Sequence, residues 1–330
     1  MYDLKILYFT DTHIRGTTPK NRKDNILETL ERKFNEIVNI INLKNIDFVL
    51  HGGDIFDRPD ISPSVVRKFA MILNNIKVPI YAIAGNHDLY GHNPNTLHRT
   101  MLGLFDGIEL LKLINEKEKI ILEKDDIKVQ LTGAPYKYGI DSDRNKASYI
   151  INEKDENVNY AIHLVHGMLL DKPFIKGIPY TLIDDILETK ADITLCGHYH
   201  SGFGIKEFNN KFFINPGSLI RITNSLKEIK RIPKVLIINI QKDIKLDFYY
   251  LESAKNGEEI LDRSVIEKNM FKNEKMIYFK QSVEASQDFN KLDINHVLND
   301  LSIADNIDKK VKSEAIKRIE EAQIEIGKED

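Results

Sequence analysis

The chain has 330 residues, of which 42% are hydrophobic and 29% charged, and its formal net charge is −3. This composition is ordinary for a globular protein and excludes a strong global basic field, although a local basic groove is compatible with it. No apolar run is long enough to span a bilayer, the first residues lack a signal-peptide layout, and the single cysteine, Cys196, excludes an intrachain disulfide. We therefore expect a cytoplasmic protein with no membrane association and a buried, unreactive Cys196.

The N-terminal quarter of the chain alternates between strand and helix patterns. Apolar residues recur every three or four positions between Ile26 and Ile41, which predicts one buried face of a long helix. The predicted order is a strand at 4–9, a helix at 26–41, a strand at 46–50, a helix at 63–75 and a strand at 78–84. This β-α-β-α-β order predicts a largely parallel sheet.

Further strands follow in the middle of the chain. Short strands with charged turns are expected between about 108 and 131, and two buried strands at 161–167 and 193–198. Residues 203–208 and 211–214, joined by Asn209-Asn210, predict a hairpin. A last strand pair is expected at 235–240 and 244–251.

After about Ser253 the sequence becomes more charged and helical in pattern. We expect a domain at 1–253 and a small helical region at 254–330. A helix capped near Asp308 would carry the apolar residues Val311, Ala315, Ile319, Ala322 and Ile326.

Five of the predicted strands end in turns that carry metal-ligand or acid–base residues. The turns hold Asp11-Thr12-His13, Asp54, Asn86-His87-Asp88, His166 and His198-Tyr199-His200. Because α/β sheets place their sites at the carboxyl ends of strands, these side chains are expected to converge.

The seven candidate ligands offer carboxylate, imidazole and amide groups but no thiolate. These are Asp11, His13, Asp54, Asn86, His166, His198 and His200. Such a set suits Mn²⁺, Fe²⁺ or Zn²⁺, and it is large enough for two ions that share a carboxylate. A pair of divalent ions promotes in-line displacement at phosphorus. His87 is placed to protonate a leaving oxygen, and the Asp88 carboxylate is expected to orient it.

The five blocks resemble, in the same order, the signatures of the calcineurin-like metallophosphoesterases. The resemblance spans residues 11–200 and implies a four-layer α/β/β/α sandwich with a dinuclear centre. It implies that Asp11, His13 and His200 hold one metal and that Asn86, His166 and His198 hold the other. By the same resemblance, Asp54 bridges the two metals and His87 donates the proton.

Flanking residues resemble the SbcD-type double-strand-break repair nucleases of bacteria and phages. The resemblance rests on Gly52-Gly53-Asp54-Ile55-Phe56-Asp57 and Asn215-Pro216-Gly217-Ser218-Leu219. Archaeal and eukaryotic members carry a histidine where this chain has Asp57. The subfamily implies a Mn²⁺-dependent DNA exonuclease and endonuclease that acts in repair or recombination. It also implies a homodimer that partners an SbcC-type, SMC-like ABC ATPase through its helical C-terminal region.

Two alternative functions stay open at this point. A small-molecule phosphodiesterase or phosphomonoesterase would use the same centre inside a closed pocket, whereas a nuclease needs an open basic groove. A metal-bound interaction module is the non-enzyme alternative, because a fold alone does not imply an activity.

Some polar residues are less tightly tied to the motifs. Arg58 and Arg221 are candidates for binding substrate phosphates, because guanidinium binds phosphate bidentately. His163 is expected to be a hydrogen-bonded core residue, and His51 to support the Asp54 turn. His92 and His98 are either substrate contacts or exposed loop residues, and His296 is expected on the surface.

Overall fold

The computed structural model describes residues 3–142 and 145–285, together with positions 308, 310, 311, 313–315, 317 and 318. It divides into two compact units, Met1–Asp262 and Arg263–Asp330. The first unit carries all the candidate site residues named above. His296 and part of the apolar stripe, Ile319, Ala322 and Ile326, lie outside the described residues.

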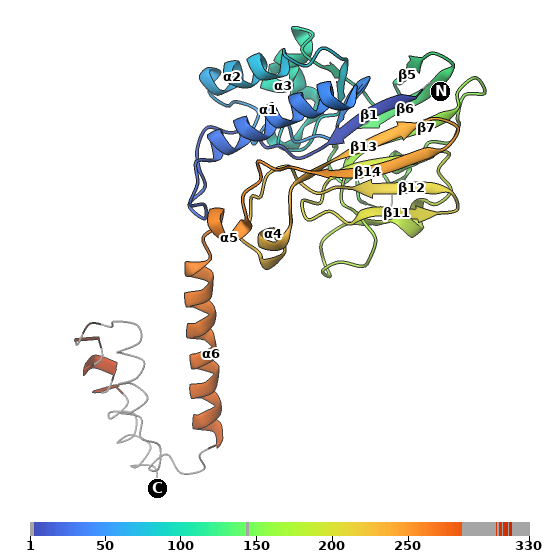
Figure 1. Ribbon diagram of the computed structural model, residues 1–330. Helices are drawn as coiled ribbons and strands as arrows, with labels where there is room; N and C mark the ends of the chain where they lie inside the picture. Colours follow the sequence, from blue (N-terminus) through green and yellow to red (C-terminus); the bar gives the residue numbers. More distant parts are fainter. Residues whose placement is uncertain are drawn as a thin grey trace. The chain divides into compact units, whose positions relative to one another are not determined.

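The first sheet of the larger unit is built mainly from the N-terminal part of the chain (Figure 1). Its order is β14-β13-β1-β2-β3-β4. Neighbours from β1 to β4 pair in parallel, as the alternating pattern predicts, while β13 and β14 add antiparallel strands. The strands are β1 (Leu4–Phe9), β2 (Phe48–His51), β3 (Ile80–Ala82), β4 (Lys112–Leu113), β13 (Lys234–Ile240) and β14 (Ile244–Tyr250).

The second sheet has the order β11-β12-β10-β7-β6-β5. Its four central strands pair in parallel, and the two edge strands pair antiparallel to them. The strands are β5 (Lys119–Lys124), β6 (Ile127–Ala134), β7 (Tyr160–Gly167), β10 (Ile193–His198), β11 (Gly204–Phe208) and β12 (Lys211–Asn215). A separate two-stranded ribbon pairs β8 (Leu169–Leu170) with β9 (Thr181–Leu182).

The two sheets pack face to face through a core of mainly aliphatic side chains. Ile6, Tyr8 and Leu50 of the first sheet share this core with Leu164 and Leu195 of the second. These residues are fully buried, so both strand sets read as continuous apolar runs in the sequence.

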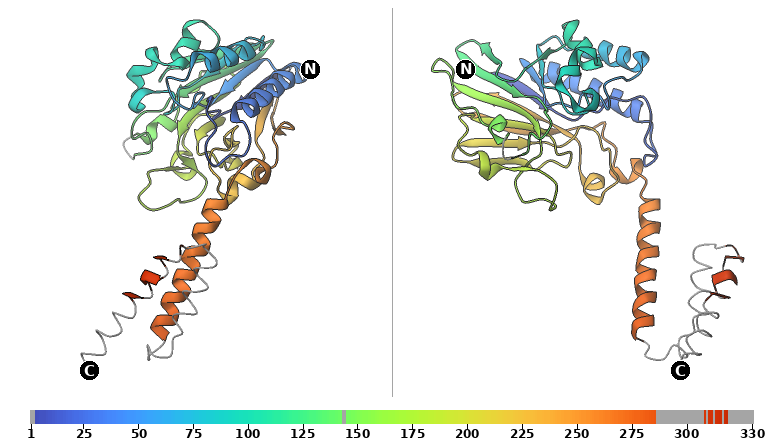
Figure 2. Two further views of the ribbon diagram at one scale, coloured as in Figure 1. Left: turned by 90° about the vertical axis from the view of Figure 1, so that its left-hand side faces the viewer. Right: turned by 180° about the vertical axis from the view of Figure 1, so that it is seen from behind.

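Helices cover the outer face of the first sheet (Figures 1 and 2). The long helix begins after Asn25, whose side chain accepts hydrogen bonds from the backbone N–H groups of Leu27 and Glu28, and it ends at Asn45, which is left-handed with φ 52°. Phe34 of this helix packs against Phe9 of β1 and Phe69 of the next helix. The helices are α1 (Ile26–Lys44), α2 (Pro63–Leu73) and α3 (Met101–Gly107), with short 3-10 helices η1 (Tyr90–His92) and η2 (Pro94–Arg99) before α3.

Short 3-10 helices cover the outer face of the second sheet, where the predicted four-layer sandwich suggests longer helices. Val165, Cys196 and Phe213 pack there against Tyr149 of η3 (Lys146–Tyr149) and Ile186 of η4 (Ile183–Ile186). The free Cys196 is fully buried, as predicted. The predicted α/β/β/α architecture is confirmed, with two central sheets flanked by helices and the fourth layer formed by short helices.

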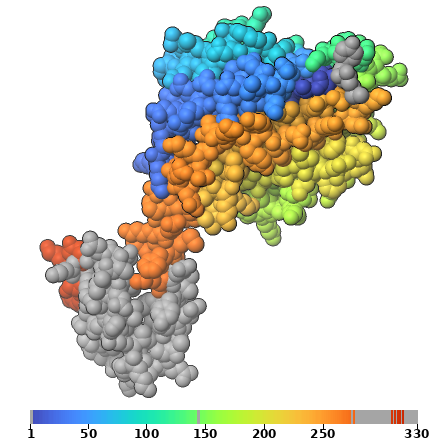
Figure 3. Space-filling model, in the orientation of Figure 1, coloured from blue at the N-terminus to red at the C-terminus, as the bar shows by residue number. Residues whose placement is uncertain are grey.

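The C-terminal part of the larger unit returns to α1. Glu36 of α1 accepts hydrogen bonds from the backbone N–H groups of Glu252 and Ser253, and Lys44 lies over the ring of Tyr249. Figure 3 shows the two segments side by side, α1 in blue and the β13–β14 region in orange.

The chain remains part of the larger unit beyond the boundary expected at 253. The backbone N–H of Lys23 donates to Ile260, and that of Asp262 donates to Asn21. These bonds tie α5 (Gly257–Ile260) to the N-terminal loop, near α4 (Leu226–Lys230). The second unit contains α6 (Ser264–Ala285). Within the described part of the chain, no helix combines the length and hydropathy that crossing a bilayer would require.

Candidate metal centre

The five predicted turns meet at the carboxyl ends of the two sheets' parallel strands. Asp11 and His13 follow β1, Asp54 follows β2, and Asn86 follows β3. From the second sheet, His166 lies at the end of β7 and His198 ends β10, with His200 just beyond. The turns are also bonded to each other, because the backbone N–H groups of Asp11 and His13 donate to Gly53 and Asp54.

One group of side chains brings together two carboxylates and two imidazoles. Asp11, His13, Asp54 and His200 each offer one ligand atom, and these atoms lie within 4.8 Å of one another. His13 Nε2 is 3.1 Å from His200 Nε2 and 3.6 Å from Asp54 Oδ2, while His200 Nε2 is 3.6 Å from Asp11 Oδ1. This is the set that the family resemblance implies for the first metal, with Asp54 in reach.

A second group lies on the other side of Asp54. His166 Nε2 is 3.3 Å from Asp54 Oδ2 and 3.2 Å from Asn86 Oδ1, and His198 Nδ1 is 2.9 Å from the same Asn86 oxygen. Asp54, His166 and His198 form a potential cation-binding cluster. The two groups therefore share the Asp54 carboxylate, and the fold with this residue cluster supports two divalent ions.

One buried carboxylate oxygen at the centre lacks a hydrogen-bond partner within the described part of the chain, as expected of a cation ligand. Asp54 Oδ2 is buried and has no hydrogen-bond partner among the described residues, although His13 Nε2 and His166 Nε2 both face it. A buried carboxylate oxygen without a donor costs free energy, and a divalent ion would remove that cost. The donor set of oxygen and imidazole nitrogen fits Mn²⁺, Fe²⁺ or Zn²⁺ equally well.

The backbone at four of these residues is left-handed, which non-glycine residues adopt uncommonly. The φ angles are 52° at Asp11, 42° at His13, 53° at Asp54 and 76° at His198. Such conformations cluster where side chains must be held in a required direction, and here the surrounding hydrogen bonds hold them. The backbone N–H of His198, for example, donates to both carboxylate oxygens of Asp11, at 3.0 and 3.2 Å.

Two glycines allow the turns that carry the ligands to approach each other closely. A Cβ at Gly53, where φ is 97°, would collide with the His166 ring, and one at Gly85 would collide with the Asp54 carboxylate. The glycines in the Gly-Gly-Asp and Gly-Asn-His sequences are therefore needed for close approach as well as for turning.

The pKa shifts of Asp54, His13 and His198 favour the deprotonated forms that bind metal ions. Burial raises the pKa of Asp54, but the imidazoles of His166 and His13 outweigh it and hold this pKa well below its ordinary value. Burial lowers the pKa of His13 well below 6.5 and that of His198 to about 3, so both rings are neutral. Although burial lowers the pKa of His166, the Asp54 carboxylate raises it to about 9 in the absence of metal. A metal ion would displace that proton, because only the neutral ring can coordinate it.

Hydrogen bonds from residues outside the ligand set orient several ligands and their loops. His166 Nδ1 lies 2.7 Å from the carbonyl oxygen of Gly52, which directs Nε2 toward Asp54. Ser218 Oγ donates to the Asp11 carbonyl, so the Asn-Pro-Gly-Ser-Leu turn braces the first ligand. His51 bonds with Thr12 Oγ1 and accepts from the Gly53 N–H, which confirms that it supports the Asp54 turn.

His87 lies at the edge of the first group, and its ring centroid is 4.7 Å from that of His13. Its Nδ1 lies 2.9 Å from the carbonyl oxygen of Asp57. Asp88 does not orient His87, contrary to the prediction. Its carboxylate is fully buried and accepts hydrogen bonds from the backbone N–H groups of Ile55, Phe56 and Gly85.

This correction has a local cause. The Asp88 side chain turns inward to satisfy the N–H groups of the two turns that carry Asp54 and Asn86, so a main-chain carbonyl holds His87 instead. Burial and the neighbouring Asp54 charge raise the pKa of Asp88 to about 7. Asp88 therefore shapes the site without touching the proposed acid.

The two candidate phosphate-binding arginines differ in exposure. The Arg58 side chain is 66% exposed and lies 3.6 Å from Asp60, so it is free to reach a ligand. Arg221 is only 1% exposed, and its guanidinium donates to the carbonyl oxygens of Arg231 and Lys255. The expectation that Arg221 binds substrate is wrong for this structure, because its donors are used inside the fold.

The remaining histidines divide as their contacts dictate. His163 is buried between Thr132 Oγ1 and the Ser148 carbonyl oxygen, which confirms a hydrogen-bonded core residue. His92 and His98 are exposed. Sequence reasoning missed Tyr136, whose ring centroid is 6.0 Å from that of His198 and 6.3 Å from that of His166.

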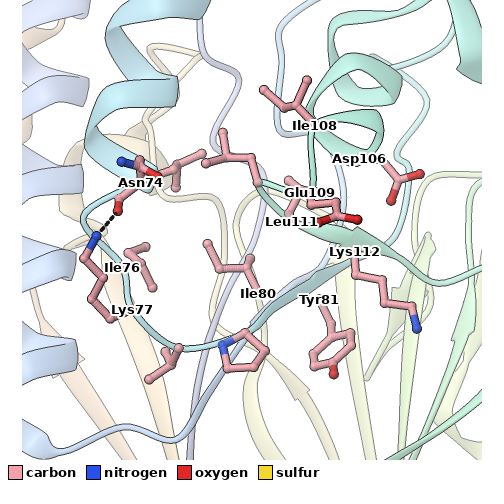
Figure 4. A pocket seen from close by; sticks show the side chains of 14 residues that line it. Asn74, Ile76, Lys77, Ile80, Tyr81, Asp106, Ile108, Glu109, Leu111 and Lys112 are labelled. Carbon is pink, nitrogen blue, oxygen red and sulfur yellow. Dashed lines mark hydrogen bonds between the residues drawn. The ribbon is translucent and has the colours of Figure 1, made fainter.

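A large cavity of about 780 Å³ lies away from this centre (Figure 4). It is lined by the end of α2, the loop entering β3 and the segment after α3, including Ile76, Ile80 and Leu111. These are the amino ends of β3 and β4, whereas the candidate ligands follow the carboxyl ends of their strands. The cavity therefore contributes nothing to the metal centre.

Known proteins resemble this chain in sequence and fold. The DNA double-strand break repair protein Mre11 of Thermoplasma acidophilum is 27% identical over 201 residues, covering 59% of this chain and 51% of that protein. The Mre11 of Sulfurisphaera tokodaii is 27% identical over 237 residues, covering 68% and 54%. The chain thus spans about half the length of these curated relatives.

A solved structure and a family match extend the comparison. The structure described as GAP50, the anchor in the inner membrane complex of Plasmodium, has a TM-score of 0.50 at 12% identity, covering 77% of this chain and 86% of its own; it shows the fold alone. The calcineurin-like phosphoesterase family matches residues 4–202, the region that holds every candidate ligand. The chain belongs to the calcineurin-like phosphoesterase family.

Proposed function

We propose that this metal-dependent phosphoesterase is a DNA nuclease of the SbcD type that hydrolyses phosphodiester bonds with two divalent ions. One observation carries the proposal: two ligand groups meet at a single carboxylate oxygen, Asp54 Oδ2, with His87 beside them. The Mre11 relatives favour a nuclease over other members of the family.

Each candidate ligand has a proposed role. Asp11, His13 and His200 would hold one ion, Asn86, His166 and His198 the other, and Asp54 would bridge them. When bound, the ions supply charge that stabilises an in-line displacement and activates the attacking water. Mn²⁺ is our expectation for both positions, from the subfamily resemblance.

His87 would protonate the leaving oxygen. The Asp57 carbonyl can only accept a hydrogen bond, so His87 Nδ1 carries the hydrogen in that contact. Nε2 is then the nitrogen that exchanges a proton with substrate. The fixed ring orientation supports general-acid catalysis, since the donor must be positioned before the bond breaks.

Exposed residues support the proposed binding of substrate and of a partner. Arg58 is exposed near the Asp54 turn and would contact a DNA phosphate.

In the second unit, α6 exposes the large apolar side chains of Val265, Met270, Phe271 and Met276. Exposed apolar side chains in one helix support binding of a protein partner. We propose that this partner is an SbcC-type ATPase and that the nuclease works as a homodimer in the cytoplasm.

The test is digestion of linear duplex DNA by the purified protein with Mn²⁺, with and without an SbcC-type ATPase. We expect Mn²⁺-dependent cleavage that His87→Ala slows by about 10²- to 10⁴-fold and that the ATPase enhances. Rapid turnover of a small phosphodiester without any DNA cleavage, even with the ATPase, would favour the small-molecule alternative.

A further inference from the structure

Tyr136 occupies the seam between the two sheets, beside the second ligand group. It follows β6, and its backbone N–H donates to the carbonyl oxygen of Ala84, in the loop that leads from β3 to Asn86. Its ring is half-buried and packs against the cores on the outer faces of both sheets. The ring is therefore anchored on two sides and has a fixed place.

Three imidazole rings lie within 6.3 Å of the Tyr136 ring. His198 lies 6.0 Å away at an interplanar angle of 34°, and His166 lies 6.3 Å away at 76°, centroid to centroid. The exposed His92, the last residue of η1, lies 5.7 Å away at 82°. The His92 backbone is held left-handed with φ 58°. An aromatic ring held in this way beside the second ligand group can stack on a flat apolar part of a substrate bound at the centre.

The position of His87 decides which part of a substrate can reach this ring. His87 contacts His13 in the first ligand group, while Tyr136 contacts His166 and His198 in the second. The leaving oxygen lies at His87 if that residue protonates it. The group near Tyr136 is then the one that stays joined to phosphorus through the ester bond that is not cleaved.

We infer that Tyr136 is a specificity-determining residue that stacks on the base of the nucleoside that keeps the phosphate. The inference rests on the proposed function and adds a nucleobase subsite to it. Stacking on an aromatic ring tolerates every base, so the subsite would select nucleotides over simple phosphodiesters without selecting a sequence.

The test compares two substrates that share a leaving group. Thymidine p-nitrophenyl phosphate, with the 5′ and 3′ isomers assayed in parallel, carries a base on the retained side. Methyl p-nitrophenyl phosphate carries only a methyl group there. For Tyr136→Leu with Mn²⁺ we expect kcat/KM to fall about tenfold on the faster thymidine isomer, mainly through KM, and less than about twofold on the methyl ester. Tyr136→Phe should retain the preference for thymidine, because it keeps the ring.

Tyr138 provides a matched control, since it is 86% exposed and lies two residues along the same loop. Tyr138→Leu should leave both substrates unchanged, and the metal content of all variants should match the parent. Equal losses on the two esters, or a Tyr136→Phe enzyme as impaired as Tyr136→Leu, would overturn the stacking inference alone. Failure of the unaltered protein to hydrolyse either ester would contradict the proposed function and the subsite with it.

Discussion

The backbone N–H of His87 donates a hydrogen bond to Asp54 Oδ1 over 2.8 Å, while the other carboxylate oxygen of Asp54 faces His13 and His166. One side chain thus fixes the backbone of the proposed acid and joins the two ligand groups. The His87 backbone cannot move away from Asp54 without breaking this bond. If His87 is the acid, metal binding and proton donation are coupled through Asp54.

Replacing His87 should separate good leaving groups from poor ones. General-acid catalysis contributes about 10²- to 10⁴-fold to rate, and His87→Ala should slow DNA cleavage by that factor. A p-nitrophenolate leaving group needs little protonation, so the loss on a p-nitrophenyl ester should stay below about tenfold. Steady-state kinetics on both substrates checks this, with metal content measured as the control. Equal loss on both would show that His87 acts through the metal centre and not as the acid.

Replacing Asp88 should affect stability before chemistry. In Asp88→Ala, the buried N–H groups of Ile55, Phe56 and Gly85 lose their acceptor. We expect the free energy of unfolding to fall by about 3 kcal/mol and metal affinity to weaken. Asp88→Asn keeps one acceptor oxygen and should lose less. Urea denaturation of the metal-free proteins measures the free energy of unfolding of both variants. An unchanged midpoint for Asp88→Ala would refute the stabilising role of the Asp88 carboxylate.

The two arginines should behave oppositely. Arg58→Ala should weaken DNA binding and reduce its dependence on salt by about one phosphate contact, with the free energy of unfolding unchanged. Arg221→Met removes the donors to the Arg231 and Lys255 carbonyl oxygens, so it should lower stability instead. Binding of duplex DNA across a salt series, paired with thermal melts, distinguishes them. A folded Arg221→Met protein with normal stability and lost DNA affinity would restore Arg221 as a substrate ligand.

Asp24 should contribute a stability term that depends on pH. Burial raises its pKa, but hydrogen bonds from Arg22 and Thr29 outweigh this and place the pKa below 3.8. A carboxylate with a lowered folded-state pKa stabilises the fold above its unfolded pKa, and this contribution is lost as pH falls through the folded pKa. Asp24→Asn should therefore cost about 2 kcal/mol at pH 7.

The cost of Asp24→Asn should shrink as the pH falls below about 4. Urea denaturation at pH 7, 5 and 3.5 measures the difference between parent and variant. A difference that stays constant across these pH values would mean that the Asp24 charge contributes nothing.

The sequence predicted the fold because its apolar periodicity is strong where burial is complete. The buried face of α1 and the continuous apolar runs of β7 and β10 left little choice of element. The Asn209-Asn210 pair predicts the hairpin turn because asparagine adopts left-handed backbone readily, and both residues do have positive φ. The short helix α3, capped by Thr100 and containing two glycines, has no such signal and was not predicted.

Within the site, the sequence predicted which residues gather but not every role. Ligand types after successive strands imply convergence, because parallel strands end at one edge. Whether Asp88 faces His87 or the backbone depends on which N–H groups lack acceptors, and that is decided only by tertiary structure. Arg221 looks like a phosphate ligand until burial is known, and Tyr136 stands in no motif at all.

A crystal grown with Mn²⁺ and measured at the manganese absorption edge tests the dinuclear centre most directly. We predict two anomalous peaks about 3.5–4 Å apart on either side of Asp54 Oδ2. The Asp54→Asn protein should lose at least one of the two. Two peaks flanking Asp54 would support the dinuclear centre, whereas no peak, or a single peak away from Asp54, would contradict it.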